Sequence, residues 1–488
     1  MRTLLVVVAL LVPLTADAQI TFERTYGSAF GEWGYSVEET SDGGYIIAGG
    51  AEPYAGGQSD AYLIKTDISG DTVWTRTYGG SNWDWGYSAE ETDDDGYIIG
   101  GYTGSFGAGG DDVYLIKTDS SGDTIWTRTY GGPDYDHGRS VDQTSDGGYI
   151  IVGEFQPYGG APKDVYLVKT GASGETVWTR TYGGGDEEYG RSVDQTSDGG
   201  YIVGAWAASF GAGGLDVYLL KVDASGDTVW TRTYGGQDHE EDRWVRQTSD
   251  GGYVMAGFSE SFGSGGYDIY VIKTDATGDT AWTRTYGGSD DEYGYSVEET
   301  GDGGYVIAGY TASFGAGGYD VYLIKTDASG DTVWTRTYGG ADDDYARSID
   351  VTSDGGYVVA GYTASFGAGG DDVYLIKTDA EGLVQVTEEP REEPHPGAFA
   401  LMQNRPNPFR ATTAIRFALP SAQPVKVTLY DARGAVVREL TSGKMHAGVH
   451  ELLWDGLDAR GREVASGIYF YRLEAGDFSE TKRMVLLR

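Results

Sequence analysis

The chain has 488 residues, no cysteine and a formal net charge of −40. The lack of cysteine excludes disulfides and thiolate metal sites, so the core alone must stabilise the fold. Residues 398–488 hold 13 basic and 9 acidic side chains, which leaves −44 on residues 1–397. A negative field of this size opposes binding to nucleic acid and favours binding to cations or basic partners. The alternative interpretation is a solvated surface whose charge only keeps the protein soluble.

Residues 1–18 have the three parts of a cleaved secretory signal. Arg2 precedes an apolar run over 4–14, and Ala16-Asp17-Ala18 ends the segment. The mature chain is therefore predicted to begin at Gln19. No later stretch approaches the roughly 20 apolar residues that a membrane helix needs, so we expect no transmembrane segment.

A 52-residue unit recurs seven times over residues 19–388 without insertion or deletion, and one large aromatic residue marks the same position in each copy. These residues are Phe22, Trp74, Trp126, Trp178, Trp230, Trp282 and Trp334. A period of about 50 residues with four strand patterns per unit is typical of propeller blades. The sequence predicts an all-β protein, a seven-bladed β-propeller followed by a small Ig-like β-sandwich.

The second unit illustrates the expected blade. Its four predicted strands cover 72–78, 87–92, 97–103 and 112–118. The last of them is apolar on both faces, as expected of a sheet packed between two other sheets. In the first, Trp74, Arg76 and Tyr78 share one face, and we expect a guanidinium packed against aromatic rings between blades.

The chain begins inside the repeat, which predicts how the ring closes. Residues 21–26 match only the Trp-bearing strand, so they are expected to complete the seventh blade beside 372–378. A degraded eighth copy over 383–387 could compete for that place.

The segments Gly-Gly-Tyr, Asp-Val-Tyr-Leu-Ile-Lys-Thr-Asp and Trp-Thr-Arg-Thr-Tyr-Gly-Gly recur through residues 20–388. In them the chain resembles the seven-bladed propeller repeats of secreted bacterial proteins. The resemblance implies the architecture and leaves the function open.

One loop of the repeat has a chemical character that strands do not require. All seven copies place an acid there, at Glu32, Asp84, Asp136, Glu188, Glu240, Glu292 and Asp344. The next position is mostly aromatic and reads Trp33, Trp85, His137, Tyr189, Glu241, Tyr293 and Tyr345. A carboxylate beside a flat ring suits sugars, because one accepts hydroxyl hydrogen bonds and the other packs on C–H faces. We expect a glycan or protein ligand on this acidic face.

The same loops could bind calcium, which takes hard oxygen ligands. The candidate ligands are Asp290, Asp291, Glu292, Asp342, Asp343 and Asp344. No loop matches the twelve-residue EF-hand pattern, and the sequence establishes no cofactor. The alternative is that each acid only caps its loop or pairs with a nearby arginine, which would be Arg139, Arg191, Arg243 or Arg347.

Enzyme chemistry has little support in the repeat. Of five histidines three lie outside the ring, and neither His137 nor His239 has a recurrent nucleophile beside it. Paired carboxylates are so common here that choosing one glycosidase couple would be arbitrary.

Residues 389–397 form a charged, proline-punctuated linker, after which the repeat ends and the charge becomes positive. The remaining segment, 398–488, alternates short apolar strands with turns and predicts a β-sandwich. Its predicted strands cover 414–419, 425–430, 436–440, 450–454, 468–473 and 482–487.

This last segment resembles the C-terminal sorting domain of type IX secretion substrates, which is built like the Ig-like domain of flagellar hook-capping proteins. The motif residues that carry the resemblance are Pro406, Asn407, Pro408, Gly467, Tyr469, Lys482 and Arg483. The resemblance implies a secreted or outer-membrane-surface protein of a Gram-negative bacterium, with residues 398–488 read by the secretion machinery. An Ig-like module that only spaces or adheres is the alternative.

The hypothesis from the sequence is therefore an exported, non-catalytic binding or adhesion propeller. A polysaccharide hydrolase that uses two rim carboxylates and a purely structural surface protein remain as alternatives.

Overall fold

The computed structural model describes residues 19–52, 58–157, 159–384, 399–402, 404, 412–431, 435–462, 464, 467–476 and 478–486. All of its regular elements there are β-strands, and none of these residues belongs to a helix that could cross a membrane. The chain divides into two units, residues 1–387 and 388–488. The predicted signal (1–18), the linker (389–397) and Pro406, Asn407 and Pro408 lie outside the described residues.

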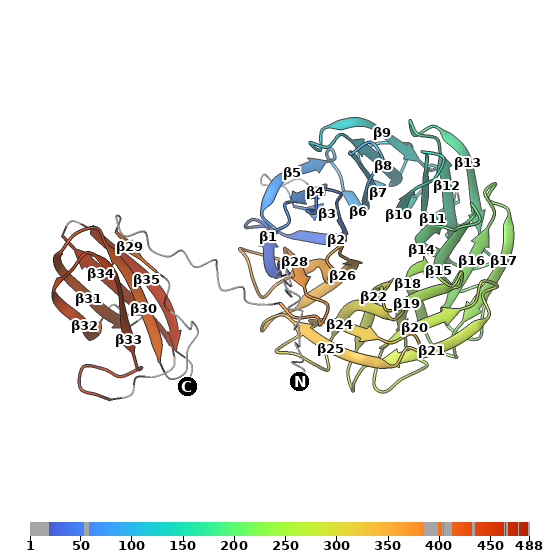
Figure 1. Ribbon diagram of the computed structural model, residues 1–488. Helices are drawn as coiled ribbons and strands as arrows, with labels where there is room; N and C mark the ends of the chain where they lie inside the picture. Colours follow the sequence, from blue (N-terminus) through green and yellow to red (C-terminus); the bar gives the residue numbers. More distant parts are fainter. Residues whose placement is uncertain are drawn as a thin grey trace, which may run out of the picture. The chain divides into compact units, whose positions relative to one another are not determined.

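The first unit consists of seven four-stranded sheets arranged in a ring (Figure 1). The innermost strands are β2 (Glu32–Glu39), β6 (Asp84–Glu91), β10 (His137–Gln143), β14 (Glu188–Gln195), β18 (Glu240–Gln247), β22 (Glu292–Glu299) and β26 (Asp344–Val351). The second strands are β3 (Tyr45–Ala51), β7 (Tyr97–Thr103), β11 (Tyr149–Phe155), β15 (Tyr201–Ala207), β19 (Tyr253–Ser259), β23 (Tyr305–Thr311) and β27 (Tyr357–Thr363).

The outer half of each blade completes the meander. The third strands are β4 (Asp60–Thr66), β8 (Asp112–Thr118), β12 (Asp164–Thr170), β16 (Asp216–Val222), β20 (Asp268–Thr274), β24 (Asp320–Thr326) and β28 (Asp372–Thr378). The outermost strands are β5 (Thr72–Tyr78), β9 (Thr124–Tyr130), β13 (Thr176–Tyr182), β17 (Thr228–Tyr234), β21 (Thr280–Tyr286), β25 (Thr332–Tyr338) and β1 (Phe22–Tyr26). The predicted strands are confirmed, except that β6 begins three residues earlier than expected.

Burial follows the propeller geometry. All seven residues of β8 are buried, including Leu115 and Ile116, because each blade is covered by a neighbour on both faces. The outermost strands instead alternate, and Val73 remains 59% exposed. The apolar cores are therefore sandwiched between successive blades.

The outer Trp strand joins each blade to the next. Trp74 packs edge-on against Tyr97 of the following blade, with ring centroids 5.7 Å apart. The guanidinium of Arg76 lies 5.6 Å from the Trp74 ring, and the Tyr78 hydroxyl donates to the carbonyl of Gly122 at 2.7 Å. Gly122 has a φ of +77°, and a Cβ there would lie 2.8 Å from the Trp74 ring. The predicted interblade role of this strand is confirmed.

A buried lysine holds the hairpin between the first two strands of each blade. In the sixth blade the Lys325 ammonium lies 3.0 Å from the Asp302 carboxylate and donates to the carbonyl of Thr326 at 2.8 Å. The carboxylate also accepts from the Thr300 hydroxyl and the Gly304 N–H. These donors, with Thr300 the largest contribution, lower the pKa of Asp302 to about 2.

The chain's N-terminal strand closes the ring as predicted. In the sheet β1-β28-β27-β26, β1 runs antiparallel to β28 and pairs Phe22 with Lys377 and Tyr26 with Val373. The Tyr374 hydroxyl donates to the Glu23 carboxylate across this seam. Backbone pairing between residues 347 to 355 positions apart thus completes the seventh blade.

The second unit is a sandwich of two sheets, with orders β29-β30-β33 and β32-β31-β34-β35. Its strands are β29 (Ala400–Leu401), β30 (Thr413–Leu419), β31 (Gln423–Asp431), β32 (Val436–Met445), β33 (Gly448–Trp454), β34 (Gly467–Ala475) and β35 (Phe478–Leu486). Each predicted strand is present and most are longer. Phe417, Trp454 and Tyr471 fill the core between the sheets and are fully buried.

Candidate functional site

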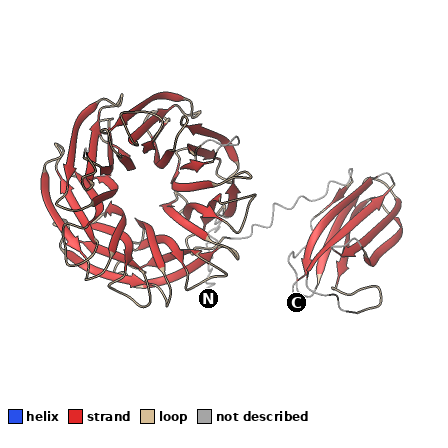
Figure 2. Ribbon diagram, turned by 180° about the vertical axis from the view of Figure 1, so that it is seen from behind, coloured by secondary structure: helices blue, strands red, loops and turns tan. Residues whose placement is uncertain are grey.

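The seven innermost strands surround the centre of the propeller (Figures 1 and 2). Because the copies have equal length, each repeat position contributes one side chain per strand to a layer around the axis. In β2 the second, fourth and seventh residues, Trp33, Tyr35 and Glu38, are each half-buried. With a rise of about 3.3 Å per residue, the three layers follow one another along the channel.

The predicted acidic residues lie at the start of the inner strands and are buried, none more than 5% exposed. Asp84 accepts hydrogen bonds from the hydroxyls of Thr103 and Ser105 and from the Gly80 N–H at 2.8 Å. Glu240 accepts hydrogen bonds from the Ser259 hydroxyl and from the N–H groups of Ser261 and Gly236. The other five carboxylates accept hydrogen bonds from their own blades or from the loops before them. They are Glu32, Asp136, Glu188, Glu292 and Asp344. These carboxylates hold the loops in place, and their contact with a ligand stays a prediction.

The predicted calcium ligands are engaged in similar loop contacts. Asp291 accepts the N–H of Tyr267 at 3.0 Å, and Asp343 accepts that of Tyr319 at 2.9 Å. Within the described ranges, no group of three or more acidic or histidine side chains is arranged to hold a metal ion. Calcium binding at Asp290, Asp342 and their neighbours stays a prediction.

The aromatic residues that follow the acids form the first layer, at one mouth of the channel. Trp33 and Trp85 have centroids 5.3 Å apart, and Tyr189 stacks on Trp206 of its own blade at 4.0 Å. The other members of this layer are His137, Glu241, Tyr293 and Tyr345. We call the whole first layer the aromatic mouth. On the same face, glycine-rich loops expose a phenylalanine in five blades, at Phe106, Phe210, Phe262, Phe314 and Phe366.

The second layer was not predicted as a site. It consists of three tyrosines and four arginines, which are Tyr35, Tyr87, Arg139, Arg191, Arg243, Tyr295 and Arg347. The Arg139 guanidinium lies 4.6 Å from the Tyr87 ring, and that of Arg347 lies 4.2 Å from Tyr295. The arginines do not pair with the predicted loop acids. Arg139 pairs with the buried Glu154 at 2.7 Å, and Arg243 pairs with Glu241 at 2.7 Å.

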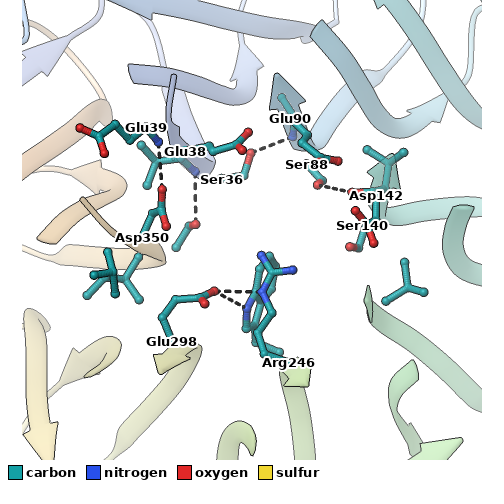
Figure 3. Close-up of a pocket in the computed structure, with 18 of the residues that line it drawn as sticks. Ser36, Glu38, Glu39, Ser88, Glu90, Ser140, Asp142, Arg246, Glu298 and Asp350 are labelled. Carbon is teal, nitrogen blue, oxygen red and sulfur yellow. Dashed lines mark hydrogen bonds and ion pairs between the residues drawn. The ribbon is translucent and has the colours of Figure 1, made fainter. Parts of the chain in front are cut away.

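The third layer lines a cavity of about 350 Å³ at the other end of the inner strands (Figure 3). Six blades place a carboxylate there and one an arginine, in the order Glu38, Glu90, Asp142, Asp194, Arg246, Glu298 and Asp350. Several of these carboxylates accept a backbone N–H from the next blade. The Glu91 N–H donates to Glu38 at 2.9 Å, and the Gln143 N–H donates to Glu90 at 2.7 Å. The layer thus links neighbouring blades around the channel.

Charge in this third layer is unevenly balanced. Burial, followed by the negative charge of Asp142, raises the pKa of Glu90 to about 9. Burial also raises the pKa of Glu38 to about 7. Arg246 forms ion pairs with two of these carboxylates, with Nε 3.0 Å from Glu298 and Nη1 3.4 Å from Asp194.

The fifth inner strand, β18, departs from the others at several positions. Where most copies read Gly and Ser, it has Asp242 and Trp244, and Arg246 replaces the acid of the third layer. The Trp244 Nε1 donates to Glu298 at 3.2 Å beside Arg246. Comparing the copies position by position, and asking where one copy differs, could have pointed to the channel.

The residues of the predicted sorting motif that the structure describes occupy different places in the sandwich. Tyr469 is buried and packs against Trp454, with centroids 5.2 Å apart. Gly467 begins β34, while Lys482 and Arg483 lie on β35, where the Lys482 ammonium is 3.7 Å from Glu480. Tyr469 is thus part of the hydrophobic core of the sandwich.

Comparison with known proteins identifies the sandwich. Residues 407–477 match the family of FlgD Ig-like domains. Over 174 residues the chain is 28% identical to the regulatory protein FlaEY of Caulobacter vibrioides, a match that covers 30% of this chain and 18% of that protein. The chain therefore spans less than a fifth of the length of that relative.

Among solved structures, the chain is similar to PorZ, a surface component of the type IX secretion system of Porphyromonas gingivalis. The match has 13% identity and a TM-score of 0.40, and it covers 92% of this chain and 59% of PorZ. The polysaccharide lyase Uly1 is similar at 10% identity and a TM-score of 0.45, with coverage of 73% and 91%. The sheets of the structure and the family match together show an all-β protein of repeated propeller sheets with an Ig-like domain near its C-terminus.

Proposed function

We propose that the protein is an exported, non-catalytic propeller that binds glycans at the aromatic mouth. The observation that carries the proposal is the run of half-buried rings around one end of the channel, with Trp33, Trp85, Tyr189, Tyr293 and Tyr345 at equivalent positions. Rings held in this way present apolar faces to sugar C–H groups at little cost in conformational entropy.

The blades give this mouth a rigid support. Each ring lies next to a buried carboxylate that fixes the loop before it, as Asp84 does for Trp85. The Trp33 Nε1 is itself held by Asp371 at 2.9 Å. A preorganised aromatic surface of this kind suits binding without chemistry.

A glycan array on the full chain tests the proposal, followed by titration calorimetry with a binding glycan. Trp85→Ala should weaken binding at least tenfold. Ile125→Ala is the matched control, because Ile125 is 56% exposed on an outermost strand and should leave affinity unchanged. No glycan binding, or equal affinity in Trp85→Ala, would refute the proposal.

For localisation, we propose that residues 398–488 direct transport to the cell surface or medium of a Gram-negative bacterium through its secretion machinery. The Ig-like fold and the residues Gly467, Lys482 and Arg483 support this. A fluorescent protein fused to residues 398–488 should reach the outside of a host that has a type IX system, and the fusion should stay inside when that system is deleted.

Polysaccharide hydrolysis is a second candidate. It is supported by the channel cavity, where Glu38 and Glu90 have the raised pKa values that a general acid requires. Release of reducing ends from polysaccharides, abolished by Glu90→Gln, would favour this candidate over the binding function.

A further inference from the structure

We infer that the arginine layer of the channel, Arg139, Arg191 and Arg243, is a binding site for the carboxylate or sulfate group of an acidic saccharide. This inference rests on the proposed glycan-binding function and names the class of sugar. The site lies one layer below the aromatic mouth, at the fourth residue of the inner strands β14 and β18 and at the equivalent position of β10.

The layer holds more positive than negative charge. Arg139 and Arg243 each have a carboxylate partner, Glu154 and Glu241, at 2.7 Å. Arg191 forms no ion pair with any described residue, and its guanidinium lies 5.6 Å from the ring centroids of Tyr189 and Trp206. In a chain with a net charge of −40, this is a local cationic centre.

Asp242 does not supply the missing charge. Its carboxyl is buried and points at the backbone of Gly204, where a Cβ would lie 2.0 Å from Oδ2. Neither of its oxygens has a hydrogen-bond partner in the described part of the protein. Burial raises the pKa of Asp242 well above its usual value, which disfavours the charged form of this carboxyl.

Two donors beside each other lack acceptors. The Nε of Arg191 and the Nε1 of Trp206 are both buried, and no described group accepts from either. Buried donors of this kind carry a desolvation penalty that an acceptor from a ligand would remove. Burial and the charges of Arg243 and Arg139 also lower the pKa of Arg191 to about 10, and the negative charge of a bound anion would act in the opposite direction.

The surroundings select a saccharide over a bare ion. Beside Arg191, the half-buried ring of Tyr189 stacks at 4.0 Å on the buried Trp206 and offers an aromatic surface at the mouth. The side chains of Arg139 and Arg243 remain about a fifth exposed, so a group entering from the mouth can reach them. A planar carboxylate matches the guanidinium fork, and a sulfate supplies the same oxygens.

The test is titration calorimetry of the full chain with trigalacturonate, its neutral counterpart galactotriose, a sulfated galactose trisaccharide and inorganic sulfate. We expect one or both acidic trisaccharides to bind at least tenfold more tightly than galactotriose, and which of them binds identifies the anionic group. Inorganic sulfate should bind far more weakly. Equal binding of galactotriose and the acidic sugars would refute the anion site while leaving the glycan function standing.

Variants separate a binding role from a structural one. Arg191→Met should abolish the preference for the acidic sugar and leave the melting temperature unchanged or higher, because an unpaired buried cation is removed. Arg232→Met, which lies on the outermost strand β17, is the control and should keep the preference. A lower melting temperature with an unchanged preference in Arg191→Met would overturn the inference. Absence of binding to every sugar would instead refute the proposed function.

Discussion

Replacing Glu90 by Gln should stabilise the propeller at alkaline pH. Glu90 belongs to the carboxylate layer of the channel, where burial and Asp142 raise its pKa from an ordinary value of 4.5 to about 9. Between these values the folded state binds more protons than the unfolded state, so stability falls as the pH rises through that window. The upper bound at pH 8 is about 5 kcal/mol, from 1.36 kcal/mol per pH unit above 4.5.

The measurable gain is smaller, because Asp142 titrates together with Glu90 and the two share protons. We expect Glu90→Gln to raise the free energy of unfolding by about 2 kcal/mol at pH 8 and by almost nothing at pH 4.5. The glutamine oxygen can still accept the Gln143 N–H that Glu90 binds at 2.7 Å. Guanidinium denaturation followed by tryptophan fluorescence at the two pH values measures the difference.

Glu298→Gln is the contrasting variant in the same layer. Glu298 lies 3.0 Å from the Arg246 Nε, so its replacement weakens the shorter of the two ion pairs that Arg246 forms with described residues and should destabilise the fold. A loss of stability in Glu90→Gln at pH 8, or an equal gain at both pH values, would refute the electrostatic reasoning.

Three further substitutions test other parts of the structure. Asp302→Asn weakens the acceptor of the buried Lys325 and should cost about 1–2 kcal/mol at pH 7. Because the pKa of Asp302 is lowered to about 2, its contribution is present above pH 4 and lost towards pH 2, so denaturation curves of variant and wild type should converge in acid. Phe22→Ala removes a buried ring from the closing strand and should cost about 3 kcal/mol, seen by calorimetry in the propeller transition only. Tyr471→Phe removes a hydroxyl that donates to Met402 and accepts from Asn404, and should lower the sandwich transition by about 1–3 kcal/mol without moving that of the propeller.

The sequence by itself determined the fold. The constant spacing from Phe22 to Trp334 defined the blades, and the offset at residues 21–26 predicted the pairing of β1 with β28. Strand bounds such as Asp112–Thr118 could be predicted because an apolar run on both faces, bounded by glycine turns, is a local signal. The Ig-like domain was likewise evident from strand spacing and motifs.

Only the tertiary structure decided what the channel contains. Glu38, Glu90 and Arg246 are 52 or more residues apart, and their mutual distances follow from closing the ring rather than from any local pattern. The predicted loop acid Asp84 looked like a ligand group, yet its oxygens bind Thr103 and Ser105 of its own blade. Whether a carboxylate meets a hydroxyl, an arginine or open space depends on neighbours that only packing brings together. The contacts of the loop acids therefore could not be predicted from the sequence, and the ligand face stays a prediction.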